Sequence, residues 1–242
     1  MTTQFITSVT DGQKNQFAKE EVKSSYGYLS GYKKPKSIVE QVQILRRLFP
    51  GIGYTDEKIE KQSIPLNAEG HFTIPRWEKI APTYGEAVRK VLDMIKNTKN
   101  GMFCNYRKDQ LSSEHLHQSV KSVQAFQKIG DEQKGYNILV VAAQFGINHR
   151  GRSVRRALEI MDSSEFALGV FAVVIMLLTH PERLQDYDDL WINCAGDEFR
   201  FVADGRFLRA PCFHFSGGRV RFVSNLVDKA HVGYGSASAF VA

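Results

Sequence analysis

The sequence predicts a fold of mixed helix and strand, either α/β or α+β. We expect a mostly parallel central sheet flanked by helices, with a C-terminal antiparallel β-meander and a mobile N-terminal arm. The first reason is a continuous apolar run at residues 138–145, which is typical of a strand covered on both faces. A second apolar run, residues 190–195, follows after enough chain for a parallel crossover connection. Beyond Phe199, short apolar runs are separated by Asp204-Gly205 and Gly217-Gly218, dipeptides that favour β-hairpins.

The composition is that of a folded protein in a reducing compartment. Hydrophobic residues make up 43% of the 242-residue chain, which is enough for a sizeable core and excludes disorder along the whole length. We expect residues 1–36 to form a basic flexible arm and residues 37–242 to form a single globular domain. The three cysteines, Cys104, Cys194 and Cys212, have no CxxC spacing and indicate neither a disulfide framework nor a zinc site. A cytoplasmic location therefore fits best.

The charge and the apolar stretches limit the classes of partner. Residues 1–10 lack the basic region and apolar run of a secretion signal. The longest uncharged apolar stretch, residues 166–178, is shorter than the roughly 20 residues that span a bilayer as a helix. We therefore expect no membrane partner. The net charge of +6 favours nucleic acid, nucleotides or acidic proteins, and the oligomeric state stays open.

The N-terminal arm is polar and rich in lysine, and it ends at the basic run 32–36. We expect much of it to be loosely held. The interleaved tyrosines Tyr26, Tyr28 and Tyr32 can either stack on bases or pin the arm to the body of the protein. Pinning is the favoured role, because a tyrosine combines a large apolar ring with one polar contact.

Apolar spacing and end signals predict the helices. The first begins at Ser37, where Ser37 and Glu40 match a capping box, and it ends at Pro50-Gly51. A short strand is expected at residues 71–74. Further helices are predicted at 84–99, at 113–129 with Ser113 as the cap, from about Ser153, and as a buried helix within 166–178 that Pro181 ends.

The candidate binding site is the stretch from Gly146 to Ser153, between the predicted buried strand and a predicted helix start. Backbone N–H groups at a helix start form an anion site, and Gly146 and Gly151 allow close approach. Arg150, Arg152, Arg155 and Arg156 add four positive charges. The predicted ligand-binding residues are Arg150, Arg152, Ser153, Gly146 and Gly151, and the expected ligand carries phosphate or carboxylate.

The spacing Gly-x4-Gly-basic-Ser in this stretch resembles the phosphate-binding P-loop, with Arg152 in place of that motif's lysine. The resemblance covers eight residues, and the forked guanidinium of arginine departs from the compact ammonium of lysine. It implies a nucleotide with magnesium, and an acidic residue at a neighbouring strand end to hold that ion. The competing interpretation is that Arg155 and Arg156 form the solvated face of a helix and pair with Glu159.

Catalytic residues are only weakly indicated. Asp197 and Glu198 follow the second apolar run, and we expect them near the arginine-rich stretch from Gly146 to Ser153 if the two strands are parallel. His149 lies at an element end, where it can act as a general base. An extended run at 190–195 separates the acidic group at 186–189 from Asp197 by roughly 20 Å, too far to share one metal ion. No metal site and no cofactor are predicted, apart from magnesium if a nucleotide binds.

The leading functional hypothesis is a protein that binds a phosphate-bearing ligand, nucleotide or nucleic acid, at residues 146–156. The sequence leaves open whether it is an enzyme. The alternative is a non-enzymatic module that binds nucleic acid or another protein through its basic surface. A third possibility is that the arginines only solubilise a helix.

Overall fold

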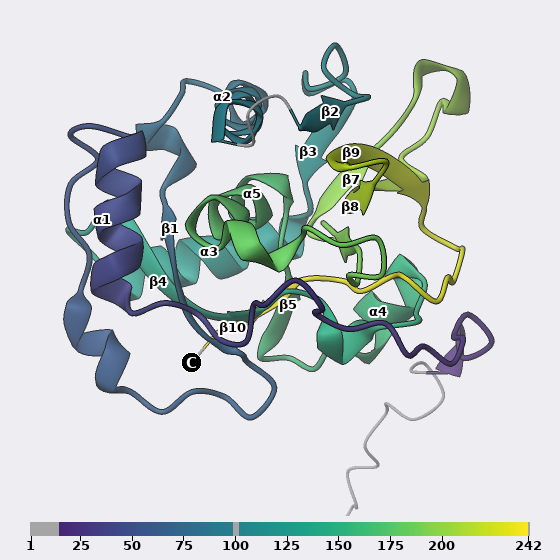
Figure 1. The fold of residues 1–242 in the computed structure, drawn as a ribbon, viewed down its shortest axis with the longest axis horizontal. Helices are drawn as coiled ribbons and strands as arrows, with labels where there is room; N and C mark the ends of the chain where they lie inside the picture. The colour runs from purple at the N-terminus through teal and green to yellow at the C-terminus, as the bar shows by residue number, and fades with distance from the viewer. Residues whose placement is uncertain (1–14, 99–101, 242) are drawn as a thin grey trace, which may run out of the picture.

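The structure is a computed structural model that describes residues 15–98 and 102–241 (Figure 1). Its α-helices are α1 (Ile38–Leu48), α2 (Tyr84–Thr98), α3 (Val120–Glu132), α4 (Val154–Ile160) and α5 (Val170–Thr179). Its strands are β1 (Gly70–Pro75), β2 (Phe103–Asn105), β3 (Leu116–Gln118), β4 (Ile138–Gln144), β5 (Glu165–Ala167), β6 (Ile192–Asn193), β7 (Asp197–Phe199), β8 (Arg209–Ser216), β9 (Arg219–Leu226) and β10 (Ser238–Phe240). Short 3-10 helices are η2 (Glu57–Lys61), η3 (Trp77–Lys79), η4 (Ile147–His149), η5 (Pro181–Arg183) and η6 (Val202–Asp204).

The described strands form two sheets, and antiparallel pairing dominates both. The four-stranded sheet has the order β1-β4-β10-β5, and each neighbouring pair in it is antiparallel. The six-stranded sheet has the order β2-β9-β8-β7-β3, with β6 beside β8, and it is parallel at the β2–β9 pair. The fold is therefore α+β.

The prediction of a mostly parallel central sheet is wrong. The apolar run at 138–145 does form a buried strand, β4, but its partners β1 and β10 are both antiparallel to it. The run at 190–195 contributes the two-residue strand β6 to the other sheet, where it pairs with β8. A central strand covered on both faces has the same apolar pattern whichever way its neighbours run, so the pattern alone did not fix the direction.

The predicted hairpin at Gly217-Gly218 is present. These glycines join β8 to β9, and both have positive φ, of 60° and 74°. Asp204-Gly205 instead lies at the end of η6, on the connection between β7 and β8, which pair through Phe199 and Arg209. The β7-β8-β9 order is the antiparallel part of the expected C-terminal meander.

Two glutamine side chains complete open edges of the four-stranded sheet. Gln41 of α1 donates to the carbonyl of His71 (2.9 Å) and accepts from the amide of Thr73 (2.9 Å), along the outer edge of β1. Gln133, just after α3, donates to the carbonyl of Val140 (2.7 Å) and accepts from the amide of that residue (2.8 Å). Each amide side chain replaces a strand neighbour, so these edges are closed to other chains.

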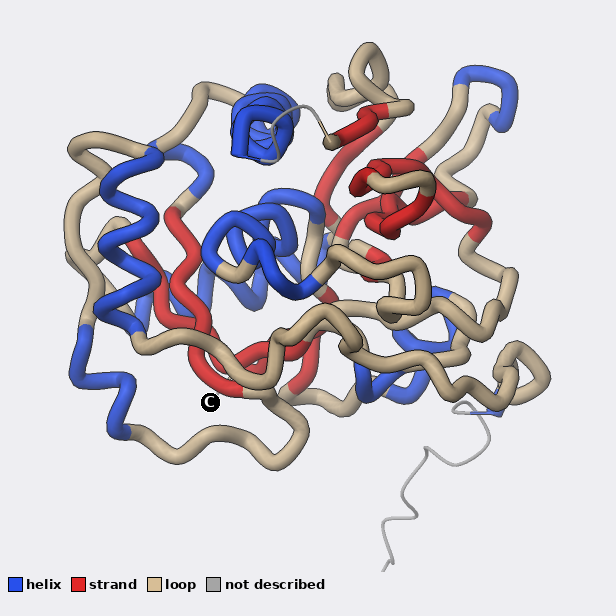
Figure 2. Tube along the Cα trace, viewed as in Figure 1, coloured by secondary structure: helices blue, strands red, loops and turns tan. Residues whose placement is uncertain are grey.

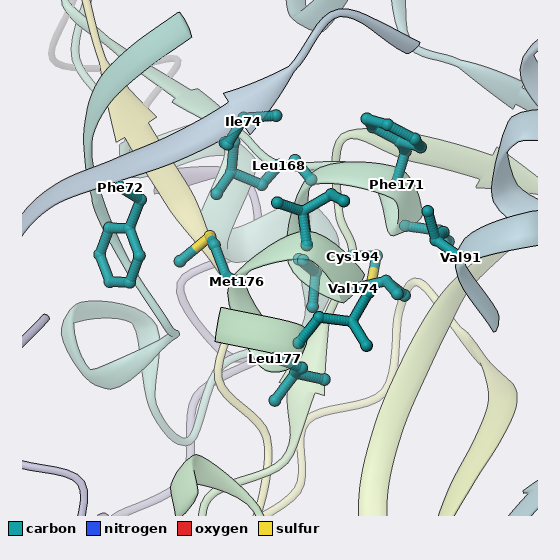
Figure 3. Close-up of a cluster of buried hydrophobic side chains, with 14 of the residues drawn as sticks. Phe72, Ile74, Val91, Leu168, Phe171, Val174, Met176, Leu177 and Cys194 are labelled. Atoms are coloured by element: carbon teal, nitrogen blue, oxygen red, sulfur yellow. The ribbon is translucent and has the colours of Figure 1, made fainter. Parts of the chain in front are cut away.

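Helix α5 is the centre of the core. All of its residues are buried, and it packs against α1, α2 and β1 (Figure 1). Figure 3 shows Val174 and Met176 of this helix among Phe72 of β1, Val91 of α2 and Cys194, which follows β6. The uninterrupted apolar sequence of α5 is accounted for by this burial on every side.

Serine caps explain where several helices begin. Ser37 and Glu40 form the predicted capping box of α1, and Ser153 caps α4 by accepting from the amide of Arg156. The predicted cap of α3 is wrong by six residues, because the helix starts after Ser119, which accepts from the amide of Ser122. Leu116, which was expected on the inner face of a helix, is instead in β3.

The described part of the N-terminal arm is held against the body. Figure 2 shows residues 15–36 as an extended loop that runs along the front of the molecule to α1. Tyr28 and Tyr32 donate to the two oxygens of Glu69 (2.5 and 2.8 Å), and the buried carboxylate of Asp189 accepts the amides of Leu29 and Ser30 (2.7 and 3.1 Å). Over this range the arm contacts the body through these hydrogen bonds, and its expected mobility stays a prediction; residues 1–14 lie outside the described residues.

The predicted core helix at 166–178 is short as well as buried. In the described part of the chain no helix is both long enough and apolar enough to cross a membrane. Cys104, Cys194 and Cys212 are free thiols, and the last two are buried.

The corrected start of α3 can be tested with two serine variants. Ser119→Ala should lower the free energy of unfolding by about 1 kcal/mol, because the first turn of α3 loses its cap. Ser113→Ala, on an exposed turn, should change it by less than about 0.5 kcal/mol. Urea denaturation measures both values. Equal effects of the two substitutions would contradict this placement of the cap.

Candidate functional site

The predicted arginine loop, residues 146–153, lies between β4 and α4, and most of its backbone donors are bonded within the chain. The amide of Gly146 donates to the side chain of Gln144, that of Gly151 to the carbonyl of Tyr234 (2.8 Å), and that of Ser153 to the carbonyl of Glu20 (3.0 Å). Helix α4 has only seven residues, so it offers little dipole to an anion. Most backbone donors of the loop are therefore already used within the chain and are not available to a phosphate.

Arg152 of the loop and Arg155 and Arg156 of α4 contact two carboxylates of the N-terminal arm. Arg155 binds both oxygens of Glu20 through Nε (2.7 and 2.7 Å), and Ser153 donates its hydroxyl to the same carboxylate (2.6 Å). Arg152 binds Glu21 (3.2 Å), and Arg156 binds Glu21 as well as Glu159. These residues do bind anionic groups, but the anions are the carboxylates of Glu20 and Glu21 in the same chain.

Arg150 differs from its neighbours. Its side chain is exposed, and its guanidinium donates to the carbonyl of Tyr26 at 3.4 Å. Among the residues that the structure describes, it takes part in no ion pair. It keeps most of its capacity to bind an external anion.

The contacts with arginine change the acidity of both glutamates. Hydrogen bonds from Arg155 and Ser153 lower the pKa of Glu20, against a smaller opposing effect of burial. For Glu21 burial is the largest single influence and raises the pKa, but Arg156 and Arg152 together outweigh it and lower the pKa overall. Both carboxylates are therefore ionised at neutral pH.

Gly151 allows the arm to approach the loop closely. Its φ is +75°, and a Cβ at this position would lie 2.2 Å from the carbonyl oxygen of Val22. The predicted role of Gly151 was to let an anionic ligand approach. In the structure the N-terminal arm uses that space.

His149 is buried in a polar cluster rather than placed for catalysis. Its Nε2 lies 2.8 Å from a carboxylate oxygen of Glu165, and the same oxygen accepts the hydroxyl of Ser238 (2.5 Å). The hydroxyl therefore contacts the carboxylate and not the imidazole, so the three side chains do not form a nucleophile–base–acid relay. The Nδ1 atom of His149 is buried and has no hydrogen-bond partner among the described residues.

Asp197 and Glu198 are adjacent in β7 but lie in different surroundings. Asp197 is buried and accepts from the hydroxyl of Tyr84 (2.7 and 2.9 Å) and from the amide of Val170 (2.7 Å), the first residue of α5. Glu198 is exposed, and its carboxylate lies 3.6 Å from the ring of His117. Consecutive residues of a strand point to opposite faces, so the two carboxylates do not act together.

Burial raises the pKa of Asp197 to about 7, although the hydrogen bonds from Val170 and Tyr84 partly oppose this. The carboxyl of Asp197 is therefore about half protonated at neutral pH. A carboxyl of this kind, next to a cavity, is a group that can exchange a proton with a ligand.

A cavity of about 340 Å³ lies on the other side of Tyr84, whose hydroxyl donates to this carboxyl. Its walls come from β1, η3, the start of α2, α3 and the start of α5, and four aromatic side chains stand in them: Trp77, Tyr84, Phe126 and Phe171. The rings of Trp77 and Tyr84 meet edge to face, with centroids 5.9 Å apart. Ring-lined cavities of this size are typical of small-molecule sites.

Gly169 separates the cavity from Asp197. A Cβ on Gly169 would lie 2.2 Å from the Asp197 carboxylate and 2.8 Å from the hydroxyl of Tyr84. Only a glycine leaves room for both groups at the start of α5. Tyr84, which lines the cavity and bonds to Asp197, connects the two.

The polar groups of the cavity wall are mostly acidic or neutral. Glu78 and Asp131 are exposed, and Gln118 and Gln127 add amides. The one cation in the wall, Arg76, donates to the carbonyls of Gly130 (2.6 Å) and Tyr136 (3.0 Å) at the end of α3, which uses much of its donor capacity. The rim therefore favours a cationic group over an anionic one.

The structure separates the residues that the sequence analysis grouped together. The arginine loop contacts the N-terminal arm, whereas Asp197 faces the start of α5 and Glu198 faces His117. The parallel strands that were expected to bring the loop and the acidic pair to one sheet edge are absent from the described sheets. The cavity was missed altogether. Tyr84 is the first residue of the helix predicted at 84–99, and no sequence signal links it to Asp197 or to Trp77.

No metal site accompanies these features in residues 15–98 and 102–241, since no three His, Cys, Asp or Glu side chains come together there in a way that could hold an ion. Comparisons of the chain with protein-family models, with curated proteins and with solved structures found no match. The functional argument therefore depends on the geometry of the chain itself.

Proposed function

We propose that the protein binds a small molecule with an apolar ring and a hydrogen-bond-donating, preferably cationic, group in the cavity beside Tyr84. The observation that supports this is the combination of an aromatic-lined cavity of about 340 Å³ with a buried carboxyl held behind its wall. Rings would pack against Trp77, Phe126 and Phe171. An ammonium group would be attracted to the faces of these rings and to the rim carboxylates of Glu78 and Asp131.

Asp197 gives this cavity a chemical role as well as a binding role. Asp197 gains and loses its proton near neutral pH, and it is hydrogen-bonded to the hydroxyl of Tyr84. This pair suits a ligand group that donates a proton to that hydroxyl or accepts one from it. The proposal is for binding. A reaction would need a ligand that places a reactive atom against Tyr84.

A bulky side chain in the wall of the cavity should weaken binding. Three indole compounds with different charges serve as probes: tryptamine, indole and indole-3-acetate. We expect tryptamine to raise the Tm most and indole-3-acetate least, because the rim is acidic. Val123→Trp, in the α3 wall of the cavity, should weaken tryptamine binding by at least about tenfold, which is roughly 1.4 kcal/mol.

Val120→Trp is the matched control for this experiment. Val120 is on the same helix, is 72% exposed and is not part of the cavity wall. It should leave tryptamine binding unchanged. Equal binding by the two tryptophan variants would show that the ligand site lies elsewhere, and no effect of any indole compound on wild type would exclude the proposed ligand class.

A second candidate function is the binding of a phosphate-bearing ligand, nucleotide or nucleic acid, at residues 146–156. The observation that favours it is that Ser153 and three arginines of this stretch already converge on two carboxylates, while Arg150 stays exposed. Guanidinium groups that bind carboxylates in this forked manner also bind phosphate. Magnesium would enter only with a nucleotide.

The second candidate predicts a stabilising effect of pyrophosphate. Millimolar pyrophosphate should raise the Tm at low ionic strength, and Arg150→Ala should reduce the rise. Arg206→Ala removes an exposed arginine far along the chain and should have no such effect. An equal reduction by both variants would indicate general charge screening rather than a site.

We also propose that the chain works in a reducing, cytoplasmic environment. Its three cysteines are all free thiols, and burial raises the pKa of both Cys194 and Cys212, so neither is a reactive thiolate. Cell fractionation of the natural host is the direct measurement of location. Recovery of the protein outside the cytoplasm would contradict the proposal.

A further inference from the structure

The contact between residues 17–22, here called the acidic segment, and the arginine loop resembles a bound peptide. The amide of Val22 donates to the carbonyl of Gly151 (2.8 Å), and the amide of Ser153 donates to the carbonyl of Glu20 (3.0 Å). Glu21 and Arg152 are bridge partners in antiparallel register. Backbone pairing fixes the position of the segment, and side-chain charges hold it there.

The two carboxylates of the segment occupy the positions that an external anion would take. Both oxygens of Glu20 receive the Nε of Arg155, and one also receives the hydroxyl of Ser153. The ring of Phe17 lies under the guanidinium of Arg155, with 4.4 Å between the guanidinium carbon and the ring centroid. A phosphate needs the same donors, so it competes with the segment for them.

The segment can leave this surface without loss of the nearby anchors. The chain is fixed downstream at Tyr28 and Tyr32 by Glu69, and at Ser30 by Asp189. The contacts of residues 17–22 are mostly charged, and each ion pair has one partly exposed partner: Arg155 is 41% exposed against 16% for Glu20, and Glu21 is 31% exposed against 12% for Arg156. Contacts of this kind are weak individually and are screened by salt.

We propose that the acidic segment is an intramolecular occupant of the arginine loop, which a phosphate-bearing ligand must displace before it binds there. The inference rests on the second function proposed above. While the segment is bound, a ligand reaches the arginines only if it displaces Glu20 and Glu21 from them. Release of residues 17–22 is then the conformational signal of ligand binding.

The test measures pyrophosphate binding by isothermal titration calorimetry at low ionic strength. The full-length variant Glu20→Gln/Glu21→Gln removes the competing charges and should bind pyrophosphate about tenfold more tightly than wild type. The control Glu57→Gln/Glu114→Gln makes the same change in net charge at two exposed glutamates and should bind like wild type. Phe17→Ala leaves the charge unchanged and should tighten binding by a smaller factor.

Hydrogen exchange supplies an independent readout. Pyrophosphate should speed exchange of the Val22 amide in wild type, because its bond to Gly151 breaks when the segment leaves. Equal affinity of wild type and Glu20→Gln/Glu21→Gln, with slow exchange at Val22 throughout, would overturn the inference and leave anion binding intact. Absence of pyrophosphate binding in every variant, including Phe17→Ala, would overturn anion binding at this loop and the inference with it.

Discussion

The fold depends on how a fully apolar helix begins inside the protein. Helix α5 has no side-chain cap of its own, since Gly169 precedes it, and its first residues are buried. A buried amide without a partner costs roughly 1 to 3 kcal/mol. Asp197 meets this requirement from β7 and Tyr84 from α2, so one carboxyl and one hydroxyl link the start of α5 to the six-stranded sheet and to a neighbouring helix.

The same arrangement creates the candidate site. Because Gly169 has no side chain, the carboxyl of Asp197 reaches the start of α5, and the ring of Tyr84 is held at the cavity wall. The aromatic residues from η3, α3 and α5 then surround the remaining space. The arginine loop lies at a different place, where its charges hold the N-terminal arm. Separate parts of the chain thus carry an apolar, acid-rimmed cavity and a basic surface, and each suits a different class of ligand.

Local signals in the sequence predicted local structure well. The capping box at Ser37, the start of a helix near Ser153, the apolar run of β4 and the hairpin glycines between β8 and β9 all depend on neighbouring residues. Strand direction depends on distant partners, and so the parallel sheet was a wrong prediction. The cavity is harder still to predict from the sequence, because its wall combines residues from β1 to α5 and its key contact joins Tyr84 to Asp197. Asp197 itself was singled out for its position after an apolar run, whereas its burial and its partners were not foreseeable.

The burial of Asp197 at the start of α5 is tested most directly by the pH dependence of unfolding in wild type and in Asp197→Asn. The native pKa of about 7 lies above the ordinary value of 3.8, so the folded protein holds this proton more tightly than the unfolded chain does. The carboxyl therefore contributes stability that is present below about pH 4 and is lost as the pH rises to about 7, by up to about 4 kcal/mol. Urea denaturation between pH 4.5 and 8 should show this decline in wild type relative to Asp197→Asn. Parallel curves for the two proteins would show that Asp197 is not buried in this way and would contradict the account.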